Sequence, residues 1–137
     1  MIDRIEQMEG SSGTITGTLR DEYGNIVTAA RVSSFKVTLA CTETDPPTIV
    51  NGRYEVDLYG GGGWASVTGM KATIDADGDC TIRLAAADNV LVTNPTVGER
   101  HDLIVEVGTN STPPTTIPDT IPLFIRKIKK PAAPAAP

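Results

Sequence analysis

His101 is the only histidine of the chain and the residue with the widest choice of chemistry. An imidazole can act as a general base near neutral pH, and Glu99 and Asp102 stand close to it in the sequence. Adjacent side chains of a strand point to opposite faces, so Asp102 cannot orient His101 locally. The sequence therefore favours a half-exposed structural histidine at the start of a strand. It contains no Gly-x-Ser-x-Gly elbow, no His-Glu-x-x-His motif and no dinucleotide fingerprint, and we expect no enzyme and no cofactor.

The two cysteines, Cys41 and Cys80, are far apart in the sequence. With a single histidine in the chain they offer too few ligands, at the wrong spacing, for a zinc site. They are either two buried thiols or one disulfide. Buried thiols are favoured for a protein made in the cytoplasm, because a free cysteine behaves as a small core hydrophobe.

Three aspartates alternate in the run that contains Asp75, Asp77 and Asp79, which suggests a calcium loop. An EF-hand loop has glycine at its sixth position and a bidentate glutamate at its twelfth. Here Gly78 is fourth and Ala86 is twelfth. A tight Asp-Gly hairpin accounts for the same residues, and the sequence leaves calcium binding open while favouring the hairpin.

Four consecutive glycines occupy positions 60–63. No Gly-Lys-Ser/Thr follows them and no helix is expected to begin there, so a phosphate-binding loop is disfavoured. The run is expected to be a flexible connector.

Composition excludes several classes of function. The formal net charge of −5 argues against a nucleic-acid partner, and the one basic cluster, Arg126-Lys127-Lys129-Lys130, is too short to reverse this. No apolar run approaches the roughly 20 residues that a membrane-spanning helix needs, and the N-terminus lacks the apolar region of a secretory signal. The sequence thus predicts a soluble product of the cytoplasm that binds no membrane.

Short strands with recognisable turns dominate the rest of the chain. Residues 14–19 are rich in β-branched side chains, and Phe35, Val37, Leu39 and Cys41 share one face of an alternating run. Asn51-Gly52 is the strongest hairpin signal, residues 85–88 suggest a single helical turn, and His101, Leu103, Val105 and Val107 share a face of the last predicted strand. About seven strands and little helix predict an all-β, antiparallel, immunoglobulin-like β-sandwich with extended N- and C-terminal arms.

The two ends are expected to lie outside that sandwich. Residues 1–12 form a predicted docking segment with a short amphipathic helix, residues 13–108 the sandwich, and residues 109–137 a Pro/Thr-rich linker, an apolar arm and a Pro-Ala tail. We expect the sandwich to fold without the arm. Residues that would dock on a partner are the apolar ones of these two segments: Ile2, Ile5, Met8, Ile121, Leu123, Phe124, Ile125 and Ile128.

Two runs carry a resemblance to a known family. Residues 13–25, which end in Asp21-Glu22-Tyr23-Gly24-Asn25, resemble the opening of small β-sandwich proteins of tailed-bacteriophage virions. Residues 74–84, followed by Asp88 and by residues 99–103, are similar to the second half of the same family. The resemblance covers about residues 13–107 and brings no catalytic residues with it.

The resemblance implies a structural virion protein, either a capsid decoration or cement protein or a neck or tail component. Its expected partners are the major capsid protein or neck and tail proteins, in a homo-oligomer or in many copies on a symmetric scaffold. An extended segment can add a strand to a neighbour's sheet edge, which agrees with this function. The alternative is a carbohydrate- or cell-surface-binding module, for which Trp64 and the three tyrosines are the available stacking residues.

Overall fold

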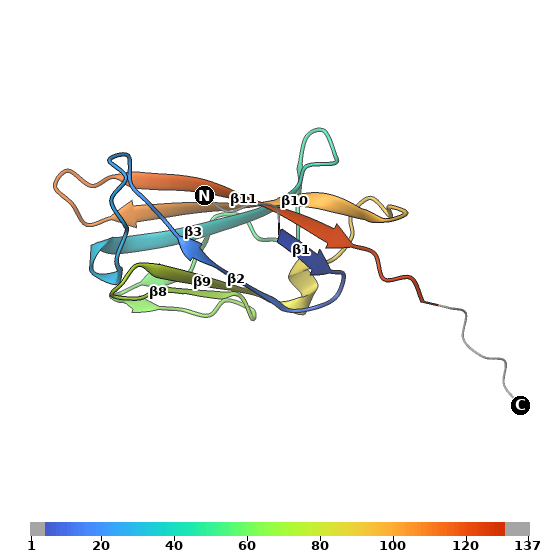
Figure 1. Cartoon of the computed structure of the whole chain (residues 1–137), viewed down its shortest axis with the longest axis horizontal. Coiled ribbons are helices and arrows are strands. Elements are labelled where there is room, and N and C mark those ends of the chain that lie inside the picture. The colour runs from blue at the N-terminus through green and yellow to red at the C-terminus, as the bar shows by residue number, and fades with distance from the viewer. Residues whose placement is uncertain (1–4, 131–137) are drawn as a thin grey trace, which may run out of the picture.

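The computed structural model describes residues 5–130, which form an all-β sandwich, as the sequence predicts (Figure 1). Among these residues no helix is long and apolar enough to cross a membrane. Two short 3-10 helices occur, η1 (Ala29–Arg31) and η2 (Ala86–Asp88), and the second is the predicted helical turn. The strands are β1 (Ile5–Met8), β2 (Gly13–Thr18), β3 (Val32–Cys41), β4 (Thr48–Ile49), β5 (Val56–Asp57), β6 (Tyr59–Gly60), β7 (Gly63–Trp64), β8 (Lys71–Ile74), β9 (Asp79–Leu84), β10 (Gly98–Thr109) and β11 (Thr116–Arg126).

Two sheets enclose the core. The larger has the order β1-β11-β10-β3-β4, with β5 also paired to β3, and the smaller has the order β2-β9-β8 (Figure 1). The alternating runs of β3 and β10 point one face inward, as predicted: Phe35, Val37, Leu39 and Cys41 are fully buried, as are Leu103 and Val107. Ile15, Ile74, Ile82 and Leu84 meet them from the smaller sheet.

Two turns at one end of the smaller sheet have the same sequence pattern and the same geometry. In Asp75-Ala76-Asp77-Gly78-Asp79 the Asp75 carboxylate accepts the N–H groups of Asp77 and Asp79, each at 2.9 Å, and Gly78 has a φ of +88°. In Asp21-Glu22-Tyr23-Gly24-Asn25 the Asp21 carboxylate accepts the N–H groups of Tyr23 and Asn25 in the same way, and Gly24 has a φ of +80°. The first turn joins β8 to β9, so the predicted Asp-Gly hairpin is confirmed.

Asn51-Gly52 forms the predicted turn, with φ values of +52° and +66° and a hydrogen bond from Arg53 N to Val50 O of 3.0 Å. It does not join two strands of a hairpin. The segments on either side, β4 and β5, both pair with β3. The turn is therefore a bulge inserted in one edge strand of the larger sheet.

The glycine run is a tight turn, which corrects the expectation of a flexible connector. Gly61 and Gly62 have φ values of +60° and +81°, and they connect β6 to β7, where Tyr59 pairs with Trp64. Positive φ at both central residues is the requirement of a two-residue hairpin turn, which glycine meets without strain.

The predictions for the two ends are wrong. Residues 5–8 are strand β1 and not helix, and β1 runs parallel to β11, Ile5 lying beside Leu123 (Figure 1). The segment taken for a separate arm supplies β11, which pairs with β10 from Gly98↔Arg126 to Gly108↔Thr116 and so lies inside the larger sheet. Hydrophobic periodicity could not reveal this, because a terminal strand and a docking arm have the same composition. Ile2 and the Pro-Ala tail lie outside the described residues.

Candidate functional site

The predicted docking residues differ in how deeply the structure buries them. Ile121, Leu123 and Ile125 are fully buried in the core and cannot dock on a partner. Phe124 is half-buried on the opposite face of β11, close to Gly98, where an added Cβ would lie 2.7 Å from the Phe124 ring. Ile5 is half-buried, whereas Met8 and Ile128 are exposed at the surface. Among the described residues of this set, Met8 and Ile128 are the most exposed.

Met8 and Ile128 belong to a larger apolar surface that the sequence did not reveal. We call Met8, Val90, Val92, Val97 and Ile128 the terminal patch; their exposed fractions lie between 36% and 52%. Two adjoining hollows of about 570 and 760 Å³ share Lys127 and Ile128 in their walls and include all five patch residues. The patch joins β1, the loop of residues 90–97 and the end of β11.

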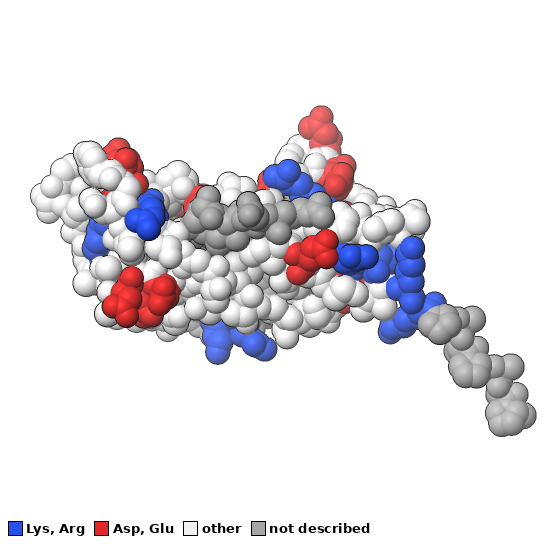
Figure 2. Space-filling model, in the orientation of Figure 1, with Lys and Arg blue, Asp and Glu red and all other residues white. Residues whose placement is uncertain are grey.

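Cations surround the terminal patch. Arg126, Lys127 and Lys129 line one hollow and Lys130 the other, with Glu6 and Glu9 as the acidic neighbours. Blue side chains gather where the described chain ends, and a red group lies at the opposite end of the molecule (Figure 2). Four of the twelve Lys and Arg residues lie at positions 126–130, so the remaining chain carries eight cations against seventeen anions. Lys and Arg side chains are thus concentrated around the terminal patch.

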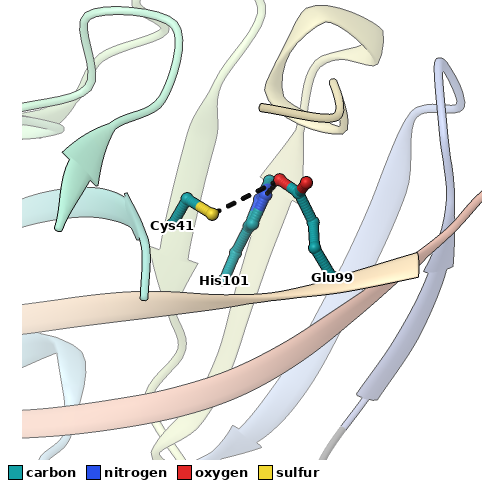
Figure 3. Close-up of side chains that lie close together, drawn as sticks. All are labelled: Cys41, Glu99 and His101. Atoms are coloured by element: carbon teal, nitrogen blue, oxygen red, sulfur yellow. Dashed lines mark hydrogen bonds and ion pairs between the residues drawn. The ribbon is translucent and has the colours of Figure 1, made fainter. Parts of the chain in front are cut away.

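Beneath this end, three ionisable side chains meet inside the sandwich. Cys41 on β3 is the cross-strand partner of His101 on β10, and Glu99 lies two residues before His101 on the same inward face (Figure 3). The Cys41 thiol donates to Glu99 Oε2 at 3.4 Å, and His101 Nε2 lies 2.5 Å from the same oxygen. All three residues are at most 1% exposed. The expected half-exposed histidine is therefore wrong, although its inward face was predicted correctly.

The loop of residues 90–97 holds the Glu99 carboxylate in place. Val92 N–H donates to Oε2 at 2.8 Å, and the Thr93 N–H and hydroxyl donate to Oε1 at 2.9 and 2.8 Å. Burial raises the pKa of Glu99, but the hydrogen bonds from Thr93, His101 and Val92 outweigh it and lower this pKa to about 2. Burial raises the pKa of the Cys41 thiol to about 11, and the Glu99 carboxylate adds to that rise.

This arrangement is unsuited to nucleophilic catalysis. A cysteine nucleophile needs a lowered pKa and an adjacent base, whereas here a carboxylate, and not the imidazole, accepts the thiol proton. Chemically the cluster can hold a proton or a cation among three donor atoms. The pairing of Glu99 with His101 follows from the two-residue period of a strand, but the approach of Cys41 depends on the register of β10 against β3, which no local pattern reveals.

A second buried charged pair joins the two sheets. Arg53, which follows the Asn51-Gly52 turn, donates Nε to Asp88 Oδ1 at 2.7 Å, and it also donates to the carbonyls of Val67 and Thr68. Asp88, in η2, also accepts the Ala85 N–H at 2.7 Å. Both charged side chains are almost completely buried. The pair connects the edge of the larger sheet to η2, which follows β9, and to the segment that precedes β8, so we assign it a structural role.

The three aspartates for which calcium binding was left open do not form a group of donors close enough to share a metal ion. Within residues 5–130, Cys41, Glu99 and His101 form the one group of three or more His, Cys, Asp and Glu donors close enough to share a metal ion. Asp75, Asp77 and Asp79 are exposed, and the Asp75 carboxylate is engaged by the backbone of its own turn. Cys41 and Cys80 are both buried and are not bonded to each other, as the sequence favoured.

Of the stacking residues proposed for a sugar ligand, Trp64 and Tyr59 are engaged with other rings, whereas Tyr23 and Tyr54 are exposed. The Trp64 ring packs edge-on against Phe35 and Tyr59, at centroid distances of 5.5 and 4.9 Å. Comparisons of this chain with family models, with curated proteins and with solved structures found no match. The function must therefore be argued from the geometry and from the sequence motifs.

Proposed function

We propose that this protein is a non-enzymatic structural component of a tailed-phage virion, either a capsid decoration or cement protein or a neck or tail accessory. The observation that carries the proposal is the terminal patch, because contiguous apolar surface with a polar rim is typical of protein interaction sites. Its cationic rim fits an acidic surface on a neighbouring virion protein. A homo-oligomer is part of the proposal, since the exposed turn of Asp75, Asp77 and Asp79 on a second copy offers such a surface.

The strand order supports the proposed immunoglobulin-like architecture. In immunoglobulin-type domains one sheet contains strands in the order B-E-D and the other in the order C-F-G. The order β2-β9-β8 and the order β3-β10-β11 correspond to these two sets, with β1 added beside β11. Such a sandwich fits a rigid module that presents loops and terminal strands to partners.

The test is a charge substitution in the terminal patch of the full-length protein. Val97→Asp and Ile128→Asp place a carboxylate on the apolar surface without entering the core, because both side chains are exposed. Tyr54→Asp is the matched control, since Tyr54 is 64% exposed and lies in the bulge of the edge strand, outside the terminal patch. The readouts are the mass in solution by light scattering and co-sedimentation with assembled capsids and with tails.

We expect Val97→Asp and Ile128→Asp to reduce self-association or co-sedimentation at least tenfold, and Tyr54→Asp to leave both unchanged. All three variants should keep the thermal stability of the unmodified protein to within a few degrees, because exposed positions contribute little to stability. A protein that stays monomeric and sediments with neither capsids nor tails would disprove the proposal.

One observation favours the carbohydrate-binding alternative. Tyr23 is 81% exposed and borders a hollow of about 680 Å³ together with Arg20, Asp21, Glu22 and Arg31. An aromatic ring beside paired polar groups can stack on a sugar and hydrogen-bond its hydroxyls. Binding in a glycan array that is lost in Tyr23→Ala and kept in Val97→Asp would support this alternative over virion docking.

A further inference from the structure

We infer that Cys41, Glu99 and His101 form a binding site for a divalent metal ion of the zinc class. One donor atom from each residue lies within 4.8 Å of the other two (Figure 3). Thiolate sulfur, imidazole nitrogen and carboxylate oxygen are the ligands that Zn²⁺ uses in proteins. Calcium and magnesium prefer six or more oxygen ligands, which this cluster does not provide. The inference is independent of the docking proposal.

The donor spacing is close to that of a tetrahedral site. Zinc–ligand bonds of about 2.0–2.3 Å place tetrahedral ligand atoms about 3.2–3.6 Å apart. Cys41 Sγ and Glu99 Oε2 are separated by 3.4 Å. His101 Nε2 and Glu99 Oε2 are 2.5 Å apart because a proton lies between them, so this pair must open by less than 1 Å when a metal replaces the proton. The three ligands leave one tetrahedral position for a water molecule.

The free ring nitrogen of His101 allows the proton transfer that metal binding requires. His101 Nδ1 is buried and has no hydrogen-bond partner among the described residues. A buried polar atom without a partner is unfavourable by about 1–3 kcal/mol. The nitrogen that faces Glu99 carries the proton of their hydrogen bond, so the lone pair of a neutral imidazole lies on Nδ1. When a metal binds Nε2, this proton passes to Nδ1, and the imidazole stays neutral.

Hydrogen bonds from neighbouring residues hold the Glu99 carboxylate in position for metal binding. Thr93 donates two hydrogen bonds to Glu99 Oε1, which leaves Oε2 as the oxygen that faces Cys41 and His101. Hydrogen bonds of this kind orient metal ligands and raise metal affinity. On binding, a metal–sulfur bond forms as the Cys41 S–H bond breaks, and the proton leaves to solvent. The thiolate and the carboxylate then balance the two positive charges of the ion, which makes the buried site neutral.

Cobalt is the probe for the test, because Co²⁺ takes zinc sites and its bond to a thiolate gives a charge-transfer band in the near ultraviolet. The full-length protein is unfolded, reduced and refolded with Co²⁺, since the site is buried and metal binding can be coupled to folding. Cys41→Ala removes the proposed sulfur ligand. Cys80→Ala is the matched control, because Cys80 is also a buried thiol but lies on β9 in the smaller sheet.

We expect the band in the unmodified protein and in Cys80→Ala, and its loss in Cys41→Ala. Zn²⁺ in hundredfold excess over its Kd should raise the Tm of the unmodified protein by on the order of 10 °C, and Mg²⁺ should not. If Cys41→Ala fails to fold, the Zn²⁺-dependent rise in the Tm of the unmodified protein still tests the inference. Refolded protein that shows neither the band nor the Zn²⁺ shift overturns the inference, as does a band that persists in Cys41→Ala.

Discussion

At the scale of single residues, the buried ion pair between Arg53 and Asp88 is expected to matter strongly for stability. The Arg53–Asp88 pair is almost completely buried, and further hydrogen bonds from Asn51 and Ala85 satisfy the carboxylate. Removing one member of such a pair leaves the other as an uncompensated buried charge. The pair between Arg100 and Asp102, in contrast, lies at the surface, with the Arg100 side chain half-exposed.

Arg53→Met should lower the free energy of unfolding by about 3–5 kcal/mol, because Asp88 would lose its cation while remaining buried. Arg100→Met is the control and should cost about 1 kcal/mol or less, since exposed ion pairs contribute little. Urea denaturation followed by circular dichroism measures both values. Equal losses in the two variants would contradict the structural role assigned to the buried pair.

The two thiols should be protected in the native protein. Burial raises the pKa of Cys80 to about 12 and that of Cys41 to about 11, and a protonated, inaccessible thiol reacts slowly. Labelling with a thiol reagent at pH 7–8 should therefore require unfolding at both positions. An introduced cysteine at the exposed Tyr54 position should be labelled at once, and rapid native labelling of Cys41 or Cys80 would be inconsistent with the observed strand registers.

At the scale of elements, the terminal strands decide which parts of the chain can be removed. β11 pairs with β10 on one side and with β1 on the other, and it contributes Ile117, Ile121, Leu123 and Ile125 to the core. β1 depends on β11 in turn, because its described partner strand is β11. Without β11, the larger sheet would therefore also lose β1.

Deleting residues 109–137 should abolish cooperative unfolding, because it removes a whole interior strand and four buried side chains. Inserting Gly-Ser-Gly into the exposed loop of residues 110–114 is the control, and it should change the Tm by only a few degrees, since loop length adds little to the entropy of closure. Thermal melts monitored by circular dichroism distinguish the two. A truncated protein that melts cooperatively near the unmodified Tm would restore the original domain boundary at residue 108.

At the scale of the whole molecule, cations are concentrated at the end that carries the terminal patch. The cations at positions 126–130 surround the terminal patch, while the body of the chain has an excess of anions. Such polarity favours contact with an acidic surface, and it disfavours contact between two copies of the same end. Burial of the apolar patch would supply most of the affinity, and the cations would orient the protein on its partner.

Association through this end should weaken with salt, because exposed charges are screened beyond about 8 Å at 0.15 M ionic strength. We expect co-sedimentation or self-association of the unmodified protein to fall severalfold between 0.02 and 0.3 M NaCl. A double variant, Lys129→Gln with Lys130→Gln, should bind less tightly at low salt and show a smaller salt dependence. Salt-independent association would assign the contact to apolar groups alone.

The sequence by itself determined the class of the fold and the local geometry. β-branched runs with a two-residue period specified strands and their inward faces, as at Phe35 to Cys41 and His101 to Val107. Asp-x-x-Gly-Asn/Asp and Asn-Gly specified turns, because glycine and asparagine accept positive φ at low cost. These features depend on residues close together in the chain, so local chemistry suffices.

Only the tertiary structure decided which strands pair and which distant side chains meet. β11 has the composition of a docking arm, and its place beside β10 depends on an inward face that other strands must cover. The convergence of Cys41 with Glu99 and His101, the burial of Arg53 against Asp88 and the assembly of the terminal patch all join positions far apart in the sequence. Their proximity follows from strand register and sheet order, which the packing of the whole core selects and no local pattern encodes.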